Sequence, residues 1–553
     1  MQARAMGSGA GGKAMPTGRV RPSEPLKSRA RASPYREDHA VETPSRMAGG
    51  HAEIELRLLF HPEDLENILA SPVITRHALD EWSDLDLTSV YYDTADLDLR
   101  RCGCALRIRT DGGHRLATLK LATAEALERT EFTSLIDDAE PDAGALSRLL
   151  PKGAIELAPN KPLRAMFSTQ VRRHLRTLAS GQGRIQLAVD HGQVVAGDRT
   201  EALNEIELEL LDGSAAAIFS LGRDLVATLR LRPSLQSKSV RGFDLVLGTA
   251  PTTSTPSIIV ARHATVDQMI EATLRSGLRH LLESQPAVED GRNPEGVHQC
   301  RVALRRLLLV LGQLGSIAPS VPLGRFQADA KWLMSTLGRA REWDVFIDEL
   351  LPSISRSCPV GDFDLVRSAA KSLRSVAYDA ARAAINEPRT GRFEIELGLW
   401  IEEQGWRTGT SIKARRRLSA PVAPFAEAAV DRLDRRVRKR GRLFGDLSIK
   451  QRHRLRIAVK NLRYAEESYG AATGVRKIGR KQKRRLVQLQ DKLGRYIDLS
   501  SLEGLVGEIV GTEMPPAGHQ SAGALLGWYA GTLPNVDREL QSVWQSYRRA
   551  CPS

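Results

Sequence analysis

The spacing of hydrophobic and polar residues changes near the middle of the chain. Between residues 51 and 248, short segments alternate apolar and polar side chains, among them AEIELRLLF, CALRIRT, HRLATLKL, RIQLAVD and NEIELELLD. A period of two is typical of β-strands that bury one face. Turn signals rich in Gly and Asp separate these segments, so we predict an antiparallel sheet. Helices are expected within this region near 62–71, 142–150 and 214–230.

From residue 258 to the C-terminus, the apolar residues follow a helical period instead. The stretch TAPTTSTPS at 249–257 separates the two regions and is predicted to be a linker. Amphipathic helices are expected near 264–284, 295–315, 323–353, 362–386, 393–404, 422–442, 450–470, 478–506 and 520–548. The predicted fold class is therefore α+β, with a sheet domain over 51–248 and an all-α domain over 258–553.

Residues 1–50 show neither period. They are rich in Gly, Pro, Ser, Ala and Arg, so we predict a disordered basic tail. Met47 stands just before the first patterned segment and is a candidate native start.

One motif occurs twice in the helical region, as HQCRVALRRL from His298 and HRLRIAVKNL from His453. Such a repeat indicates duplicated supersecondary structure. The spacing i, i+3, i+7 places cations on one face of each helix. The two basic stripes consist of His298, Arg301 and Arg305, and of His453, Arg456, Lys460 and Arg463. A solvated basic face is the plain alternative, but the duplication at matched spacing favours a shared site for a polyanion.

The overall charge agrees with acidic partners. The net charge is +14 and the pI is about 9.7, which favours nucleic acid, polyphosphate or an anionic surface. Five cysteines lack zinc-ligand spacing, and neither an apolar run of membrane-spanning length nor a secretory signal is present. We therefore expect a cytoplasmic protein without a membrane partner. Only 5% of residues are aromatic, so a stacking surface for specific nucleic-acid binding is not expected.

Charged residues recur on one face of several expected strands. Alternation places Glu53, Glu55 and Arg57 on the same face of the first strand. Two further sets behave likewise: Arg107 with Arg109, and Glu205 with Glu207 and Glu209. A solvent-exposed face is the plain alternative. The segregation of the charges by sign favours the interior of a closed antiparallel β-barrel that binds an anion together with divalent metal ions.

The ordered segments EIELR, YYDTADLDLRRCGCALRIR, TLKL, RTEF, FSTQVRR, LAVDHG, EIELEL and SKSVRGF resemble the CYTH domains of the triphosphate tunnel family. The resemblance covers about 51–248 and implies a closed tunnel that binds a triphosphate with Mg²⁺ or Mn²⁺. The family opens on Glu-x-Glu-x-Lys, whereas this chain has Arg57 in place of the lysine. This departure keeps the charge, but it changes the geometry and the proton chemistry and so puts turnover in question.

The resemblance implies roles for individual residues. The catalytic candidates are Glu53, Glu55 and Arg57. The candidate metal ligands are Glu53, Glu55, Glu207, Glu209 and Asp190, with Glu205 as a further candidate. The positions that match phosphate-binding residues are Arg57, Arg107, Arg109, Lys120, Arg172 and Lys238. Glu131 falls on the acidic position of a middle strand.

The segments VHQCRVALRRL, LGRAREWDVF, HRLRIAVKNLRYAEE and LQDKLGRYID resemble the CHAD domain, the conserved histidine α-helical domain. This resemblance covers about 258–550 and implies two four-helix bundles related by duplication, with a basic surface that binds inorganic polyphosphate. Position 308 is Leu where the second copy has Arg463, so the first stripe is the shorter one.

The function expected from both halves is metal-dependent hydrolysis of inorganic tripolyphosphate, together with polyphosphate binding by the helices. Two alternatives stay open. One is a non-catalytic polyphosphate-binding protein. The other is a tunnel enzyme for an organic triphosphate such as thiamine triphosphate or ATP.

Overall fold

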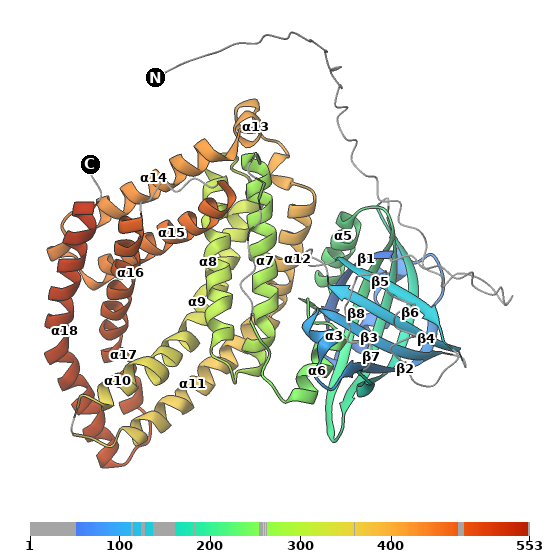
Figure 1. The fold of residues 1–553 in the computed structure, drawn as a ribbon, viewed down its shortest axis with the longest axis horizontal. Coiled ribbons are helices and arrows are strands. Elements are labelled where there is room, and N and C mark those ends of the chain that lie inside the picture. Colours follow the sequence, from blue (N-terminus) through green and yellow to red (C-terminus); the bar gives the residue numbers. More distant parts are fainter. Residues whose placement is uncertain are drawn as a thin grey trace, which may run out of the picture.

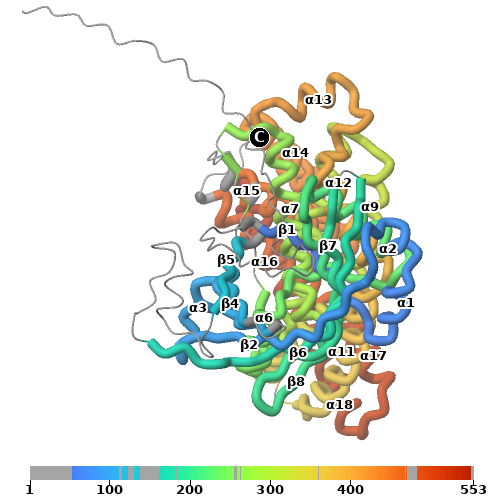
Figure 2. Tube along the Cα trace, turned by 90° about the vertical axis from the view of Figure 1, so that its right-hand side faces the viewer, coloured from blue at the N-terminus to red at the C-terminus, as the bar shows by residue number. Residues whose placement is uncertain are grey.

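The computed structural model describes residues 51–111, 114–122, 128–136, 161–181, 183–253, 258, 260–261, 263–358, 360–473 and 480–550. It consists of an antiparallel sheet followed by a helical C-terminal half (Figure 1). Figure 2 looks onto the sheet half and shows the helical half lying behind it. The mixed architecture predicted from the two hydrophobic periods is confirmed. The tail at 1–50 and the helix expected at 142–150 lie outside the described residues.

Nine strands form the sheet, in the order β5-β4-β3-β2-β6-β7-β8-β1-β9. Their bounds are β1 His51–Leu59, β2 Ser83–Thr94, β3 Cys104–Asp111, β4 His114–Ala122, β5 Glu128–Leu135, β6 Leu163–Ser180, β7 Gly183–Ala196, β8 Arg199–Asp212 and β9 Arg232–Ser234. Sequential strands mostly pair with each other, because short turns such as the one between β7 and β8 join antiparallel neighbours.

Strand β1 has three partners along its length. Its first residues pair with β5, where His51 lies opposite Glu131. Its remaining residues pair with β8, where Arg57 lies opposite Glu207, and with the short strand β9 on the other side. The pairing of β1 with β5 therefore joins β1 to the strand at the opposite end of the sheet order.

Short helices accompany the sheet. They are η1 Pro62–Asp64, α1 Leu65–Leu69, α2 Pro72–His77, α3 Asp98–Arg101, α5 Ala215–Val226 and α6 Lys238–Leu247. The helix expected at 62–71 is present as η1 followed by α1, and a further helix that was not predicted, α2, begins at Pro72, since proline fits the first helical turn. Helix α6, which carries Lys238, was not predicted, because the alternating pattern of residues 51–248 indicated mainly strands. Ser237 caps it by accepting a hydrogen bond from the Val240 amide.

The helical half contains longer elements. They are α7 Val266–Asp290, α8 Glu295–Gly315, α9 Val321–Val345, the π-helical turn η2 Phe346–Leu350, α10 Leu351–Ser355, α11 Phe363–Asn386, α12 Pro388–Glu402, η3 Gly405–Arg407, α13 Ile412–Leu418, α14 Val422–Arg440, η4 Phe444–Asp446, α15 Ile449–Thr473, α16 Arg480–Ser500, α17 Leu502–Val510 and α18 Pro516–Ala550. Helices α7, α8, α9 and α12 pack together beside the sheet, whereas α14, α15, α16 and α18 form the far side (Figure 1). None of the helices in the described part of the chain combines the length and apolar character that a membrane span requires.

The two halves share a packed boundary. Ile395 and Leu399 of α12 belong to the same buried apolar cluster as Leu56, Leu58 and the core-facing residues of α5. Polar groups also cross this boundary, because the buried Arg232 of β9 contacts Glu289 of α7 at 2.5 Å. Its neighbour on α7, Gln285, donates a hydrogen bond to the buried Glu394 of α12. Burial raises the pKa of Glu394 to about 8.

A glycine on α12 allows this close approach. A Cβ atom at Gly391 would lie 2.3 Å from the backbone oxygen of Leu231, which precedes β9. A Cβ atom at Gly312 of α8 would meet no atom within 4 Å. The same substitution at these two helical positions therefore differs only in the space available.

We predict that Gly391→Ala lowers the free energy of unfolding by about 1–3 kcal/mol, because β9 must shift away from α12. Gly312→Ala is the matched control and should stabilise by about 0.5–1 kcal/mol through helix propensity. Thermal unfolding followed by circular dichroism measures both changes. An unchanged or raised melting temperature for Gly391→Ala would show that the boundary does not need this contact.

Candidate functional site

Charged side chains from many strands converge on one face of the sheet. Strand β1 contributes Glu53, Glu55 and Arg57 at alternate positions, as its period predicted. Strand β8 contributes Glu205, Glu207 and Glu209, and β7 contributes Asp190, which lies directly opposite Glu205. Burial is deep at this face, since Asp190 and Glu205 are both 0% exposed. We call this set of residues, with the cations described next, the sheet site.

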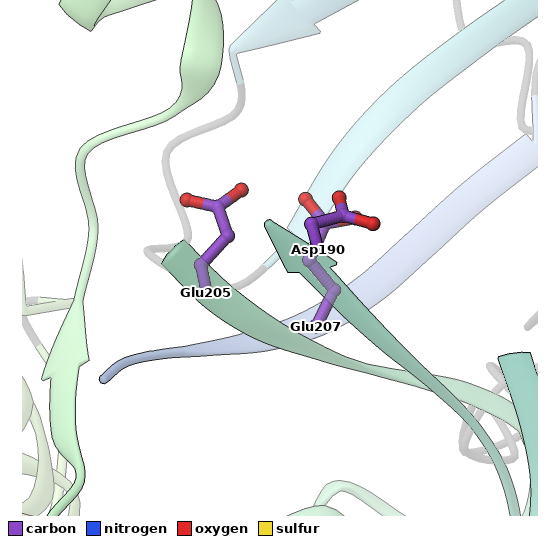
Figure 3. Close-up of side chains that lie close together, drawn as sticks. All are labelled: Asp190, Glu205 and Glu207. Carbon is purple, nitrogen blue, oxygen red and sulfur yellow. The ribbon is translucent and has the colours of Figure 1, made fainter. Parts of the chain in front are cut away.

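Three acids form the tightest group in the sheet site (Figure 3). Ligand oxygens of Asp190, Glu205 and Glu207 all lie within 4.8 Å of one another. Two carboxylates directly opposite each other on paired strands repel. This acidic trio therefore requires positive charge from a side chain or a bound cation.

Two cations neutralise the trio in the structure. Lys238, from the first turn of α6, lies 2.9 Å from Asp190 and 2.7 Å from Glu207, and it also contacts Glu205. Arg173 of β6 donates to both oxygens of Asp190 and lies 2.5 Å from Glu207. Burial alone would raise the pKa of Glu207, but the charges of Lys238, Arg173 and Arg57 outweigh it and hold this pKa well below its usual value. Asp190 behaves in the same way.

Arg57 links β1 to the trio. Its guanidinium lies 2.5 Å from Glu55, 3.4 Å from Glu205 and 3.5 Å from Glu207. It also donates to the backbone oxygen of Gln236 at 3.2 Å. Burial opposes the charged form, but the surrounding carboxylates raise the pKa of Arg57 above its already high value. Arg57 therefore acts as a fixed charge and does not exchange a proton near neutral pH.

A second acidic group lies where β1 meets β5 and β8. Lys120 of β4 bridges Glu53 at 2.7 Å and Glu131 of β5 at 2.8 Å, and Arg107 of β3 lies 3.9 Å from Glu131. Glu209 forms no ion pair with any described residue. Burial, followed by the charge of Glu53, raises the pKa of Glu209 to about 8.

The residues of the sheet site fit a divalent cation. Every candidate ligand is a carboxylate oxygen, the donor type that Mg²⁺ and Mn²⁺ prefer. One buried oxygen of Glu205 has no hydrogen-bond partner. Burial first, and then neighbouring carboxylates, raise the pKa values of Glu209 and Glu53 by more than the charge of Lys120 lowers them. A buried acidic cluster able to hold a divalent metal is therefore present.

The placement of the other sequence candidates is mixed. Lys120, Lys238, Arg107 and Glu131 all reach the sheet site. Arg109 shares the face of Arg107 on β3, and its Nε donates to the Ser89 hydroxyl at 3.3 Å.

Arg172 lies elsewhere, and the expectation that it shares the charged interior is corrected. Its side chain is exposed and pairs with Asp84 of β2 at 3.1 Å. The next residue, Arg173, faces the site instead, because successive side chains on a strand point to opposite faces. The sequence analysis did not include Arg173. The segment FSTQVRR ends in the pair Arg172-Arg173, and the prediction took the first arginine of this pair instead of the second.

The two basic stripes of the helical half come together. The charges that lower the pKa of Lys460 on α15, after burial, come from Arg456 on the same helix and from Arg305 and Arg301 on α8. The pKa of Lys460 is about 7, and that of His298, lowered by burial, then by Arg341 and also by Lys460, is about 4. Sequence reasoning missed Arg341 of α9, which no stripe contains. We call these residues the helical cation cluster: His298, Arg301, Arg305, Arg341, His453, Arg456 and Lys460.

Acidic neighbours compensate this cluster only in part. Asp498 of α16 lies 3.5 Å from Arg456, and Glu349 of η2 lies 3.1 Å from Arg341. Arg301 donates to the backbone oxygen of Met334, yet burial and neighbouring cations still lower its pKa to about 10. Arg463, the last residue of the second stripe, pairs with Glu467 at 3.1 Å.

Comparison with known families agrees with this division. Residues 51–243 match the CYTH domain, and residues 272–506 match the CHAD domain. The chain therefore contains a CYTH domain followed by a CHAD domain, and the resemblance to both families is confirmed.

Individual relatives were also found. A curated relative, the inorganic triphosphatase of Haemophilus influenzae, is 30% identical over 198 residues, which are 34% of this chain. The match spans about half of that relative, 54% of its length. Among solved structures, the CHAD domain from the plant Ricinus communis is 26% identical, with 54% of this chain and 97% of that chain covered and a TM-score of 0.46. A putative adenylyl cyclase from Hippeastrum, described as having a dominant triphosphatase activity, is 21% identical, with 35% and 95% covered and a TM-score of 0.27.

The raised pKa of Glu209 predicts how the stability of the folded protein changes with pH. Its pKa is higher in the folded protein, about 8, than the ordinary value of 4.5. The folded state therefore holds a proton that the unfolded state has released, and the resulting stability is lost as pH rises from about 4.5 to 8. Glu209→Gln removes this loss. In EDTA, the free energy of unfolding of the variant should rise relative to that of the wild type by roughly 1–3 kcal/mol as the pH increases from 5 to 8.

Urea unfolding at both pH values measures the difference. Glu66→Gln, an exposed change on α1, serves as the control and should show no such trend. A difference between wild type and Glu209→Gln that stays flat with pH would contradict the assignment.

Proposed function

We propose that the sheet half closes into a tunnel in which a divalent metal ion and the basic side chains hydrolyse inorganic triphosphate. The observation that carries this proposal is the convergence of buried carboxylates with the cations Arg57, Arg107, Lys120, Arg173 and Lys238 on one face of the sheet. Two findings support it further. The pairing of β1 with both β5 and β8 is the pairing that tunnel closure requires. The similarity to an inorganic triphosphatase agrees with the chemistry.

The ion pairs of the sheet site suggest how binding proceeds. Asp190, Glu205, Glu207, Glu53, Glu55 and Glu209 are the candidate ligands of Mg²⁺ or Mn²⁺. Three of these carboxylates, Asp190, Glu205 and Glu207, hold Lys238 in the structure, and Asp190 and Glu207 also hold Arg173. If these carboxylates held a divalent cation, the ammonium of Lys238 and the guanidinium of Arg173 would be free to contact phosphoryl oxygens. The bound metal ion supplies Lewis-acid stabilisation of the charge that develops on the transferred phosphoryl group.

The basic residues would then position the phosphate chain. Arg173 and Arg57 present guanidinium forks that match phosphoryl oxygens, and Lys238 and Lys120 supply point charges. Several cations distributed along the interior match a chain of phosphates better than one phosphate. In this scheme Arg57 binds and orients the phosphate chain and does not transfer a proton, because its pKa is raised. A non-catalytic binding role for the tunnel is the alternative that this residue leaves open.

Arg172 and Arg173 provide a matched test, since they are adjacent, identical in chemistry and on opposite faces of β6. We expect Arg173→Gln to lower kcat/KM for tripolyphosphate by about 10- to 100-fold, the effect of losing charge-assisted hydrogen bonds. Arg172→Gln should stay within about twofold of the wild type. Phosphate release with Mg²⁺ or Mn²⁺ is the measurement, and EDTA should abolish it.

The same assay on ATP and thiamine triphosphate decides between inorganic and organic substrates. Arg173→Lys, which keeps the charge, guards against misinterpreting a folding defect, as does thermal unfolding of each variant. Equal activity of the wild type and Arg173→Gln would rule out the sheet site as the place of reaction. No phosphate release from any triphosphate would leave only the binding role.

We also propose that the helical cation cluster binds inorganic polyphosphate. Its members lower one another's pKa values, so the free protein carries an electrostatic cost that a polyanion relieves. Such binding weakens with salt because counterions are released.

The pKa of Lys460 makes this proposal testable by proton uptake. Arg301, Arg305, Arg456 and the opposing Asp498 face Lys460, and a polyanion would raise its pKa from about 7. Binding near pH 7.5 should therefore take up protons and strengthen as pH falls from 8 to 6. His298, with a pKa of about 4, adds little in that window.

Calorimetry in two buffers of different ionisation enthalpy measures the uptake. Lys460→Gln should lower this uptake sharply, whereas Lys492→Gln should leave it intact, because it removes an ammonium of α16 that is paired with Glu539 of α18. Binding without proton uptake at pH 7.5 would contradict the role of Lys460.

A further inference from the structure

A cavity of about 360 Å³ lies beside the helical cation cluster, between α8, α15 and α16. We call it the side pocket. The residues that matter for its chemistry are His298 and Arg306 of α8, Lys460, Arg463 and Tyr464 of α15, and Gln490 of α16. His298 and Lys460 also belong to the helical cation cluster, so the side pocket and the cluster are continuous.

One buried donor of the side pocket lacks a hydrogen-bond partner among the described residues. The Nε atom of Arg306 is buried without a hydrogen bond, and Arg306 forms no ion pair with a carboxylate among the described residues. The guanidinium carbons of Arg306 and Arg463 lie 6.0 and 5.6 Å from the centre of the Tyr464 ring. Buried polar groups without partners are costly, and an anion with several oxygens would satisfy the donors.

The side pocket breaks the internal duplication. Alignment of His298 with His453 places Arg301 opposite Arg456 and Arg305 opposite Lys460, so the helical cation cluster draws equivalent positions from both copies. The same alignment places Arg306 opposite Asn461, and Arg463 opposite Leu308. Both guanidiniums of the side pocket therefore occur where the two copies differ. The cluster is nearly symmetric, whereas the side pocket belongs to one side of it.

We propose that the side pocket binds the terminal phosphate of a polyphosphate chain, while the helical cation cluster holds internal phosphates. This inference rests on the proposed polyphosphate binding. An internal phosphate carries one negative charge, whereas a terminal phosphate has a second ionisation near neutral pH and carries up to two. The additional charge and oxygens match the guanidinium forks of Arg306 and Arg463. Glu467 pairs with Arg463 and also lines the cavity, and its negative charge disfavours a chain that passes through the side pocket over one that ends in it.

The experiment compares two ligands on the full-length protein in EDTA, so that hydrolysis does not interfere. One is polyphosphate of defined length with free ends. The other is the same chain with an uncharged amine joined to each terminal phosphate as a phosphoramidate, which removes the second ionisation of that phosphate. We expect capping to weaken binding to the wild type by about 10- to 100-fold, the effect of lost charge-assisted hydrogen bonds. Arg306→Gln should bind both ligands equally, at the level of the capped one, and Arg306→Lys should keep part of the discrimination.

Two other variants separate this inference from the proposed function. Arg301→Gln, in the helical cation cluster, should weaken both ligands by the same factor. Arg173→Gln, in the sheet site, should keep the wild-type preference for free ends. The inference is overturned if the wild type binds capped and free chains equally while Arg301→Gln still weakens both, and polyphosphate binding then stands. It is also overturned if Arg173→Gln abolishes the preference, because the sheet site would then be what recognises chain ends. If the wild type binds neither ligand, the proposed binding function itself fails.

Discussion

Pairing between buried charges is the interaction on which the sheet half depends. Asp190 and Glu205 lie opposite each other on β7 and β8 and are fully buried, an arrangement that would be costly without cations. Arg173 from β6 and Lys238 from α6 supply them, which ties three strands and a helix to one point. A well-packed apolar interior would usually stabilise a sheet at least as well. The presence of these buried charges therefore supports the proposed binding role, in which metal ions and phosphates would exchange with the internal ion pairs.

The helical half applies the opposite electrostatic arrangement. Burial, and then repulsion between its cations, lower the pKa values of Arg301, Lys460 and His453. Asp498 and Glu349 offset only part of this charge. The acidic trio of the sheet site is thus paired with cations, whereas acids pair with only part of the helical cation cluster. A polyanion should bind the cluster readily, whereas the sheet site would require a divalent cation to release its basic side chains first.

The two halves are joined through the strand that carries the first acidic motif. Strand β1 pairs with β9, where Arg57 lies opposite Ser234 and Leu59 lies opposite Arg232. Arg232 contacts Glu289 of α7, and α7 packs along α8, which carries one basic stripe. Apolar residues of α12 complete the core beneath the sheet. The helical half therefore supports the edge of the sheet at the position of Arg57, and the sheet site and the helical cation cluster belong to one continuous framework.

The sequence alone determined those features that depend on local periodicity. Alternation placed Glu53, Glu55 and Arg57 on one face, and the i, i+3, i+7 spacing identified both basic stripes, because side-chain direction repeats with the period of a strand or a helix. Only the tertiary structure decided which groups meet. Arg172 and Arg173 are indistinguishable by charge, and strand register turned the second one inward. Lys238 reaches three acids because α6 folds back over β7 and β8. Arg306 and Arg463 share a pocket because α8 and α15 pack together. Contacts between residues far apart in the chain follow from packing across elements, which no local pattern encodes.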